Sequence, residues 1–333
     1  MGKYCISGAS VYKDVIGGGA SAKAPADVAR IAQNIGYKLL FISSHKEGKL
    51  KTYLTTFFNI NRLLYLMDSN DEVVIQYPQY HLLFLNLMVG RRFKKLKFLI
   101  HDINSVRIRG RLSGIERVCL NRADEIIVHS PEMRDYLKKQ LKAHISYKIL
   151  GCFDYYININ RDNFRRNISK DICFAGNMDK SLFLHKFIAL NNRNINFHLY
   201  GLMKNKPVGN TSYVYEGFFQ PDNVNGLKGS WGLVWDGADF NSCGGTYGEY
   251  LSIIAPHKFS LYIVAGIPPI VWSKSAMASI VRNQQLGLCI NSLQDLNEVI
   301  NSVTAEEYQT FLDNLFVYAM KISNGENTRR VLK

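Results

Sequence analysis

Short apolar runs alternate with amphipathic segments along the first half of the chain. Short apolar runs bounded by turn residues are typical of buried strands, and apolar positions that recur every three or four residues are typical of helices. The strands predicted in this half are Tyr4–Ser7, Lys38–Ser43, Glu72–Tyr77, Leu96–His101, Glu125–His129 and Tyr147–Leu150. The helices predicted between them are Pro25–Ile35, Thr52–Met67, His81–Val89, Leu112–Arg122 and Pro131–Leu141.

The same alternation starts again in the second half. Its predicted strands are Ile172–Ala175, Asn196–Tyr200, Tyr213–Tyr215, Trp231–Trp235, Ile270–Trp272 and Gly287–Ile290. Its predicted helices are Leu182–Leu190, a short one at Pro221–Leu227, one after Pro256, Ala276–Gln285, Asp295–Ser302 and a last helix capped by Thr304. Strands separated by single helices favour a parallel sheet that is covered on both faces.

The chain therefore has the pattern of two doubly wound α/β domains. We expect a first domain over residues 1–151, a linker rich in Asn, Arg and Tyr over 152–170, a second domain over 171–315 and a C-terminal helix or tail over 316–333. In doubly wound sheets the ligand binds beyond the carboxyl ends of the strands. Candidate residues are therefore sought in the loops that follow strands.

The stretch from Ser252 to Trp272 carries the most specific signal. It is predicted as a helix that starts at Pro256, ends at Gly266 and leads into a buried strand. A helix start presents backbone N–H groups, here those of His257, Lys258 and Phe259, and the Lys258 ammonium adds a full positive charge. Our central hypothesis is that this helix start holds the diphosphate of a nucleotide-sugar. The simpler alternative is a helix start with a surface lysine.

Three groups of residues in the first half are candidates. Gly18 and Gly19 lie in a Gly-rich loop after the first strand, where backbone can approach a phosphate or sugar closely, although the loop does not match G-x-G-x-x-G. Asp102 could deprotonate an acceptor hydroxyl, and His101 could do so instead; alternatively, Asp102 only caps a turn. Arg107 and Arg109 are either solvent-facing or bind a phosphate of the acceptor.

The second half offers polar groups after several strands. Asn177 and Lys180 lie in the loop after the first strand of this half, which is otherwise an ordinary βα loop. Tyr200 and Tyr213 could stack on a nucleobase, although most tyrosines pack in cores. Asp236 could bind sugar hydroxyls or a metal ion. No D-x-D pair accompanies it, so we expect no divalent metal and no other cofactor.

The charge is strongly asymmetric. Residues 1–150 contain 24 basic and 12 acidic residues, whereas residues 151–333 contain 17 and 15. The main basic clusters are 91–97 and 107–111. The excess of basic residues in this half predicts binding to phosphate groups, in nucleic acid, anionic lipid or a pyrophosphate-linked substrate. The alternative is a solvated basic face without a dedicated partner. The scattered cysteines, without C-x-x-C pairs, and the lack of a signal or a membrane-spanning run predict a cytoplasmic protein, with peripheral contact at the inner face of the membrane as an option.

Three motifs of the second half resemble a known family. F-A-G-N-M-D-K-S (Phe174–Ser181), L-V-W-D-G (Leu233–Gly237) and A-P-H-K-F-S-L-Y-I-V-A-G-I-P-P-I-V (Ala255–Val271) are similar to those of bacterial GT-B glycosyltransferases. The group in question comprises the glucosyltransferases that extend O-glycans on streptococcal serine-rich adhesins, and the β-1,6-galactofuranosyltransferases. H-D-I (His101–Ile103) and the Gly-rich loop fit the first domain.

The resemblance implies that the first domain binds the acceptor and the second a UDP-sugar. It implies that Lys258 contacts the diphosphate, with Lys180 and Tyr200 or Tyr213 assisting, and we include His257 and Ser260 of the same motif. It also implies a metal-independent hexosyltransferase, galactofuranosyl or glucosyl, that extends a surface glycan and forms a homo-oligomer. The rivals are a nucleic-acid-binding protein that uses the basic half and a UDP-sugar-binding scaffold without activity.

Overall fold

The computed structural model describes residues 2–8, 20–42, 65–78, 93–190, 194–209 and 212–333. The chain divides into two compact units. The first contains residues 22–151 together with both chain ends, Met1–Val15 and Thr328–Lys333, and the second contains Cys152–Asn327 and the short segment Ile16–Ser21. The Gly-rich loop and the predicted helix His81–Val89 lie outside the described residues, as does most of Thr52–Met67.

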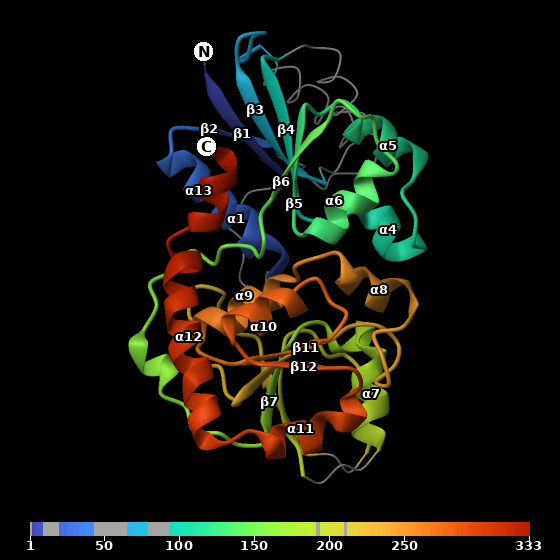
Figure 1. Ribbon diagram of the computed structural model, residues 1–333, viewed down its shortest axis with the longest axis vertical. Coiled ribbons are helices and arrows are strands. Elements are labelled where there is room, and N and C mark those ends of the chain that lie inside the picture. Colours follow the sequence, from blue (N-terminus) through green and yellow to red (C-terminus); the bar gives the residue numbers. More distant parts are fainter. Residues whose placement is uncertain (1, 9–19, 43–64, 79–92, 191–193, 210–211) are drawn as a thin grey trace. The chain divides into compact units, whose positions relative to one another are not determined.

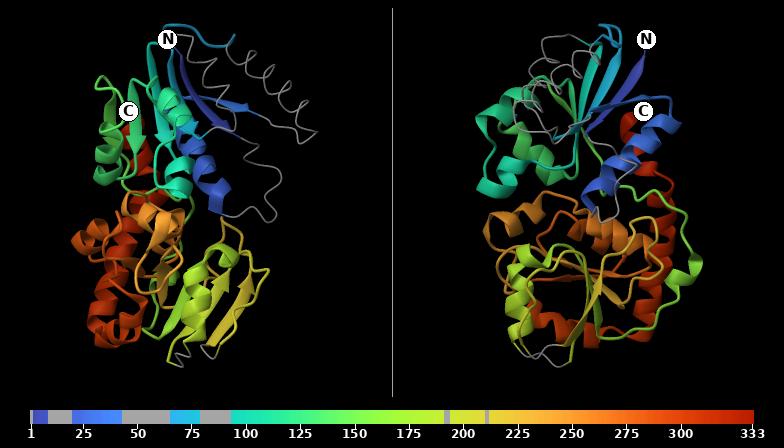
Figure 2. Two further views of the ribbon diagram at one scale, coloured as in Figure 1. Left: turned by 90° about the vertical axis from the view of Figure 1, so that its right-hand side faces the viewer. Right: turned by 180° about the vertical axis from the view of Figure 1, so that it is seen from behind.

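The first unit is built on a parallel six-stranded sheet in the order β2-β1-β3-β4-β5-β6. Helices α4, α5 and α6 lie on one side of this sheet, and α1 and α13 lie on the other (Figures 1 and 2). The strands are β1 (Lys3–Gly8), β2 (Lys38–Ile42), β3 (Glu72–Tyr77), β4 (Lys95–Ile100), β5 (Glu125–Val128) and β6 (Ser146–Ile149). The helices are α1 (Ala20–Asn34), α4 (Asn104–Arg109), α5 (Gly114–Leu120), α6 (Pro131–Lys138) and α13 (Glu326–Leu332).

Local capping explains where the helices of this unit begin and end. Ser130 caps α6 by accepting the N–H of Met133 at 3.0 Å, and Pro131 occupies the first turn, where its missing N–H costs nothing. The predicted helix Leu112–Arg122 is shorter in the structure because Ser113 is the cap of α5. Helix α4 was not predicted; Gly110, at φ 68°, ends it after six residues.

The second unit repeats this plan with a sheet in the order β12-β11-β10-β7-β8-β9, also parallel. Its strands are β7 (Asp171–Ala175), β8 (Asn196–Tyr200), β9 (Ser212–Gly217), β10 (Trp231–Val234), β11 (Pro269–Trp272) and β12 (Leu288–Ile290). Its α-helices are α7 (Leu182–Ala189), α8 (Gly245–Glu249), α9 (His257–Val264), α10 (Ala278–Gln284), α11 (Leu296–Ser302) and α12 (Ala305–Ser323). The 3₁₀ turns are η1 (Arg161–Phe164), η2 (Met178–Lys180), η3 (Tyr250–Ser252) and η4 (Leu293–Asp295).

Helix α7 lies on one side of the second sheet, and α12 lies on the other, against α9 (Figure 1). The predicted Thr304 cap is present as a full capping box with Glu307. The prediction of a short helix at Pro221–Leu227 is wrong, because these residues form two turns without helical bonding. The fold class, two Rossmann-like units with parallel sheets, is confirmed.

The chain ends depart from a simple division into halves. Residues 152–170, expected as a linker, group with the second unit, whereas the last six residues group with the first. Within the first unit, the Tyr37 hydroxyl and the Lys148 ammonium donate to the carbonyls of Leu332 and Val331, both at 3.0 Å. No helix among the residues that the structure describes is long and apolar enough to cross a bilayer.

Candidate functional site

The strand order places a crevice in each sheet where the direction of winding reverses. In the second unit this point lies between β7 and β10, because β8 and β9 continue to one side and β11 and β12 to the other. Ligands of doubly wound sheets bind at such points, beyond the carboxyl ends of the strands. The loops that follow the two strands start at Gly176 and Trp235. They belong to two of the motifs singled out in the sequence.

Tyr262 of α9 bridges the two strands that flank this crevice. Strands β7 and β10 are paired at Ile172 and Cys173. Farther along, the Tyr262 hydroxyl bridges them instead, accepting the N–H of Ala175 at 2.9 Å and donating to the carbonyl of Leu233 at 3.3 Å. Gly232 makes room for the ring, since a Cβ there would lie 2.4 Å from it. The two strands therefore separate without leaving these buried backbone groups unpaired.

Lys258 lies one helical turn before Tyr262 and reaches the mouth of the same crevice. Residues four apart share a helix face, so both side chains point toward β10 and its following loop. The Lys258 ammonium donates to the carbonyl of Trp235 at 3.1 Å and lies 4.5 Å from the ring centroid of Phe174. A Cβ on Gly176 would be 4.0 Å from the same nitrogen. The Lys258 ammonium of the third motif therefore lies close to residues of both other motifs, Leu233–Gly237 and Phe174–Ser181.

The Lys258 ammonium is surrounded by groups that have little contact with water. Burial lowers the pKa of Lys258 below the usual lysine value, and the carboxylate of Asp236 opposes that shift without cancelling it. Among the described residues Lys258 forms no ion pair, so no carboxylate oxygen of these residues lies within 4.0 Å of its ammonium. Asp236 instead accepts the N–H of Gly237 at 2.8 Å. An incoming anion would therefore meet a positive charge that the protein neutralises only at a distance.

Close backbone packing shapes the loops around the ammonium. Gly201 has φ 118°, and a Cβ on it would lie 2.1 Å from the carbonyl oxygen of Gly176. Gly237 has φ 101°, and a Cβ on it would lie 2.7 Å from the carbonyl oxygen of Gly244, in the loop that leads from β10 to α8. Residues with side chains are strained at such angles and have no space at these positions. The glycines thus let the loops after β8 and β10 pack closely against their neighbours.

The start of α9 differs in part from the expectation. Pro256 is the residue that precedes the helix, and its carbonyl accepts the N–H of Phe259 at 2.9 Å. The N–H group of Phe259 is therefore engaged within the first turn of the helix and does not face a ligand. The His257 ring stacks on Tyr155, with centroids 4.9 Å apart. The buried Ser260 hydroxyl donates to the carbonyl of Phe153 at 2.6 Å, which makes it an anchor for the helix rather than a ligand group.

In the loop after β7, the candidate residue Asn177 makes a hydrogen bond within the loop itself. The Asn177 side chain accepts the N–H of Lys180 at 3.2 Å and caps η2, so its carbonyl oxygen is already engaged. Lys180 is exposed at the end of this turn. Lys180 therefore keeps the mobility of a surface side chain, in contrast to Lys258.

Of the two tyrosines expected to stack on a base, Tyr200 is a core residue. It is 4% exposed, and its hydroxyl donates to the carbonyl of Gly226 and accepts the N–H of Lys228. Burial raises its pKa to about 12. Tyr213 is half-buried, with its hydroxyl on the carbonyl of Pro207 at 3.1 Å. The sequence analysis overlooked Tyr215, which is 39% exposed and donates to the carbonyl of Gly201 at 2.9 Å, beside the Gly176 loop.

In the first unit, His101 and Asp102 follow β4 as expected. Gln76 donates its amide N–H to the carbonyl of Pro25 at 3.1 Å, which turns its carbonyl oxygen to Nε2 of His101, 2.7 Å away. A carbonyl oxygen only accepts, so Nε2 carries the proton and, in the neutral ring, Nδ1 is the basic nitrogen. Asp102 forms an ion pair with Arg107. That partner stabilises the ionised carboxylate and weakens it as a base.

The remaining candidates of this unit do not come together at one place that the structure describes. Arg109 is exposed on the last turn of α4. Gly18 and Gly19 lie outside the described residues. Among the residues that are described, no three His, Cys, Asp or Glu side chains are grouped as metal ligands.

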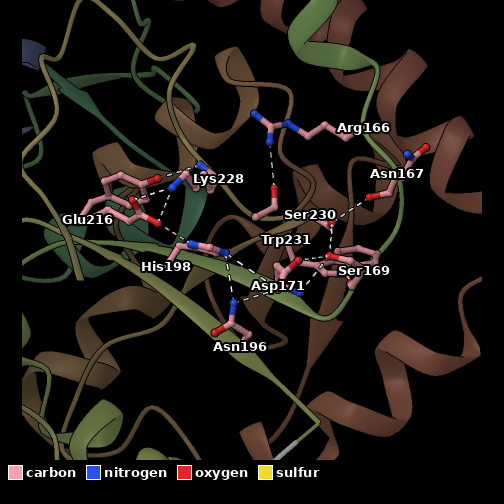
Figure 3. A network of polar contacts seen from close by, with 12 residues as sticks. Arg166, Asn167, Ser169, Asp171, Asn196, His198, Glu216, Lys228, Ser230 and Trp231 are labelled. Atoms are coloured by element: carbon pink, nitrogen blue, oxygen red, sulfur yellow. Dashed lines mark hydrogen bonds and ion pairs between the residues drawn. The ribbon is translucent and has the colours of Figure 1, made fainter. Parts of the chain in front are cut away.

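A separate polar network connects β8 and β9 to the segments that precede β7 and β10 (Figure 3). Here His198 Nδ1 lies 2.8 Å from a Glu216 oxygen, and the Lys228 ammonium lies 3.0 Å from the other. Ser169 connects Asp171 to Ser230 at 2.7 and 2.8 Å. The acids and bases of this network pair with each other and fasten the segment before β10 to the strands. Its place in the fold assigns it a structural role.

Comparison with known proteins gives consistent results for both units. Residues 12–152 match the model of the glucosyltransferase 3-like N-terminal domain, and residues 172–333 match that of the glucosyltransferase 3-like C-terminal domain. The β-1,6-galactofuranosyltransferase WbbI of Escherichia coli (strain K12) is 29% identical over 276 residues, covering 80% of this chain and 79% of the relative. Glucosyltransferase 3 of Streptococcus gordonii is 25% identical over 329 residues, covering 92% and 91%.

Solved structures agree at the level of the fold. Sucrose-phosphate synthase from Thermosynechococcus elongatus superimposes with a TM-score of 0.64 at 12% identity, covering 99% of this chain and 97% of that one. The two units are therefore those of a GT-B glycosyltransferase, as the resemblance of the motifs implied. The chain belongs to the glucosyltransferase 3-like family of glycosyltransferases.

Proposed function

We propose that this glycosyltransferase moves a hexosyl unit, galactofuranosyl or glucosyl, from a UDP-sugar to a hydroxyl group of a growing surface glycan. The observation that carries the donor assignment is the position of the Lys258 ammonium. It lies at the carboxyl-end crevice of the second sheet, close to Gly176, and within the described part of the chain it has no ion pair with a carboxylate. The names of the curated relatives supply the two candidate sugars.

The chemistry follows from where charge develops. When the anomeric carbon leaves the diphosphate, negative charge builds on the departing UDP. Fixed positive groups that point at this charge lower the barrier, and removing one such group typically costs about 10²- to 10³-fold in rate. We assign this role to Lys258, with its own backbone N–H group and the exposed Lys180 in support. Because these groups supply positive charge, we propose that no divalent metal is needed; transfer that persists in EDTA would support this.

For the acceptor hydroxyl we propose His101 as the base in preference to Asp102. The Gln76 contact directs the basic nitrogen of His101 to Nδ1, whereas Arg107 competes for the Asp102 carboxylate. Replacing His101 with Gln should then lower the rate of transfer and leave the affinity for the donor unchanged. If Asp102→Asn abolishes transfer while His101→Gln is active, the two roles must be exchanged.

The acceptor is proposed to be a glycan on a lipid or protein carrier, reached by a first unit that makes peripheral contact with the membrane. The rival, a nucleic-acid interface, loses part of its support because two lysines of the cluster at 91–97 are bound internally: Lys97 pairs with Glu72, and Lys95 pairs with Glu125, both at 2.8 Å. The motifs' resemblance also implies a homo-oligomer, which analytical ultracentrifugation would test.

The deciding experiment is a thermal-shift screen with UDP-glucose, UDP-galactose, UDP-galactofuranose and UDP-N-acetylglucosamine, with GDP- and dTDP-sugars as controls. The proposal expects stabilisation by UDP-sugars alone, followed by release of UDP when the matching donor meets a glycan acceptor. Equal stabilisation by GDP- or dTDP-sugars would overturn the UDP assignment. Binding without turnover on any acceptor would favour the inactive scaffold.

A further inference from the structure

Helices α4 and α5 and the short loop between them, here called the α4–α5 hairpin, expose an unusual set of side chains. The exposed side chains between residues 104 and 122 include three aliphatic ones, Ile108, Ile115 and Val118, which are 53%, 57% and 52% exposed. The exposed charged ones are all arginines, namely Arg109, Arg111, Arg117 and Arg122. Single exposed aliphatic residues are common on soluble proteins, but here three lie among four arginines.

The hairpin itself contains a single acidic residue, and that residue is buried. Between residues 103 and 123 the sequence has one carboxylate, Glu116, which is 6% exposed and accepts from the hydroxyls of Ser105 and Ser113. On either side of the hairpin, Asp102 pairs with Arg107, and Asp124 accepts the N–H of Leu96 at 2.7 Å. The outer surface of the hairpin is therefore positive and apolar, with no exposed carboxylate of its own.

The hairpin presents this surface from a firm base. The Ser105 hydroxyl accepts the N–H of Ser113 at 2.9 Å, which connects α4 to the cap of α5. The inward-facing Val106, Leu112 and Leu120 are buried. Ile115 and Val118 are three residues apart and so share the outward face of α5. The exposed aliphatic groups are thus not displaced core residues, because the core positions of the hairpin are filled.

We propose that the outer surface of the α4–α5 hairpin is a docking site for a bilayer that carries anionic lipid headgroups. Arginine forks pair with lipid phosphates, while Ile108, Ile115 and Val118 enter the boundary between headgroups and acyl chains. A nucleic-acid backbone would satisfy the arginines but offers nothing to the aliphatic side chains. This inference rests on the membrane contact proposed for the first unit, and it names where that contact occurs.

The test measures partition of the full chain onto phosphatidylglycerol–phosphatidylcholine vesicles by sedimentation at low and high salt. We expect salt-sensitive binding that pure phosphatidylcholine does not support. The double variant Ile115→Asp/Val118→Asp should reduce partition at least about tenfold. The matched control is Val317→Asp/Met320→Asp on α12, which places the same two charges at apolar side chains that are 57% and 42% exposed and should leave partition unchanged.

A spectroscopic variant tests insertion directly. The three native tryptophans are buried, so Val118→Trp adds an exposed indole whose emission should shift to shorter wavelength on anionic vesicles. Absence of that shift would overturn the proposal. So would a double variant that binds vesicles as well as the unmodified chain, or one that keeps binding while Arg111→Glu/Arg117→Glu loses it, because binding would then be electrostatic alone.

Donor affinity, measured by calorimetry on the same samples, separates this proposal from the proposed function. Unchanged UDP-sugar affinity in Ile115→Asp/Val118→Asp shows that the variant is folded. Vesicle binding without donor binding would remove the UDP assignment and leave the docking surface standing. Donor binding without vesicle binding would remove the docking surface alone.

Discussion

Lys97 and Lys258 are both inward-facing lysines, but they lie at different ends of their sheets. Lys97, on β4 of the first unit, is 2% exposed and pairs with Glu72 at 2.8 Å and with Glu125 at 3.9 Å. Its ammonium also donates to the carbonyl of Leu332 at 3.4 Å. Lys258, at the carboxyl-end crevice of the second sheet, touches a carbonyl and an aromatic ring, and none of the carboxylates that the structure describes pairs with it.

We propose that this difference separates a structural charge, that of Lys97, from a functional one, that of Lys258. A buried ammonium with two carboxylates is neutralised locally, and its role is to hold β3, β4 and β5 and the C-terminal residues in place. An ammonium that has only a carbonyl and a ring retains most of its attraction for an anion. We therefore propose that a buried ammonium without a nearby carboxylate marks a binding site. Four predictions test this contrast between Lys97 and Lys258.

The largest expected effect is on stability, in Lys97→Ala. Removing one partner of a buried ion pair leaves carboxylates without compensation and typically costs about 3–5 kcal/mol. We expect a loss of that size in the free energy of unfolding, measured with denaturant. The control is Lys95→Ala, because Lys95 makes the same kind of bond to Glu125 but is 38% exposed, so its pair contributes at most about 1 kcal/mol. Equal losses in the two variants would contradict the structural role of Lys97.

Lys258→Ala should show the reverse pattern. The fold should survive, while transfer falls about 10²- to 10³-fold and UDP affinity weakens, because the charge opposite the leaving diphosphate is lost. Lys274→Ala, which removes an exposed lysine from the loop after β11, is the matched control and should behave as the unmodified chain. Unchanged UDP affinity in Lys258→Ala, measured by calorimetry, would rule out the diphosphate role.

Tyr262→Phe tests the bridge across the crevice. The change leaves the ring in place and removes the hydroxyl that serves the Ala175 N–H and the Leu233 carbonyl. An unpaired buried backbone group costs about 1–3 kcal/mol, so we expect that loss in stability, together with a weaker donor affinity because both loops start from these strands. A variant with full stability and unaltered affinity would show that the hydroxyl does not maintain the crevice.

The smallest effect is on the pH dependence of donor affinity. Lys258 attracts the diphosphate only when it is protonated, and burial lowers its pKa. Affinity for a UDP-sugar should therefore be present at low pH and fall as pH rises through this lowered pKa, by at most about tenfold per pH unit. Lys258→Arg provides the comparison, because arginine stays charged throughout this range. Affinity that stays constant up to the pH at which an ordinary lysine titrates would contradict the shift.

The periodicity of the sequence predicted the strands closely, because buried parallel strands are short apolar runs with clear ends. Glu72–Tyr77 and Asn196–Tyr200 match β3 and β8 residue for residue. Helix α4 was missed, since a six-residue helix hardly shows a period, and Pro221–Leu227 was assigned a helix that tertiary contacts replace with turns.

Residue type and spacing indicated the candidate site only in part. Lys258 and the Gly176 loop were singled out because a lysine at a helix start and a glycine after a strand each suit an anion. Side chains that serve the fold look the same in a sequence: Ser260 anchors α9, Asn177 caps η2 and Tyr200 fills the core. Tyr215 was overlooked because its exposure depends on the edge position of β9.

The sequence by itself determined the two α/β units, the asymmetry of charge and the motif that carries Lys258, since these depend on local periodicity and composition. Only the tertiary structure decided which charges are neutralised and which remain available. Lys97 finds its carboxylates on two neighbouring strands, the α4–α5 hairpin exposes four arginines and no carboxylate of its own, and Lys258 meets a carbonyl and a ring. The physical reason is that a charge is stabilised by neighbours in space, and those neighbours come from distant parts of the chain.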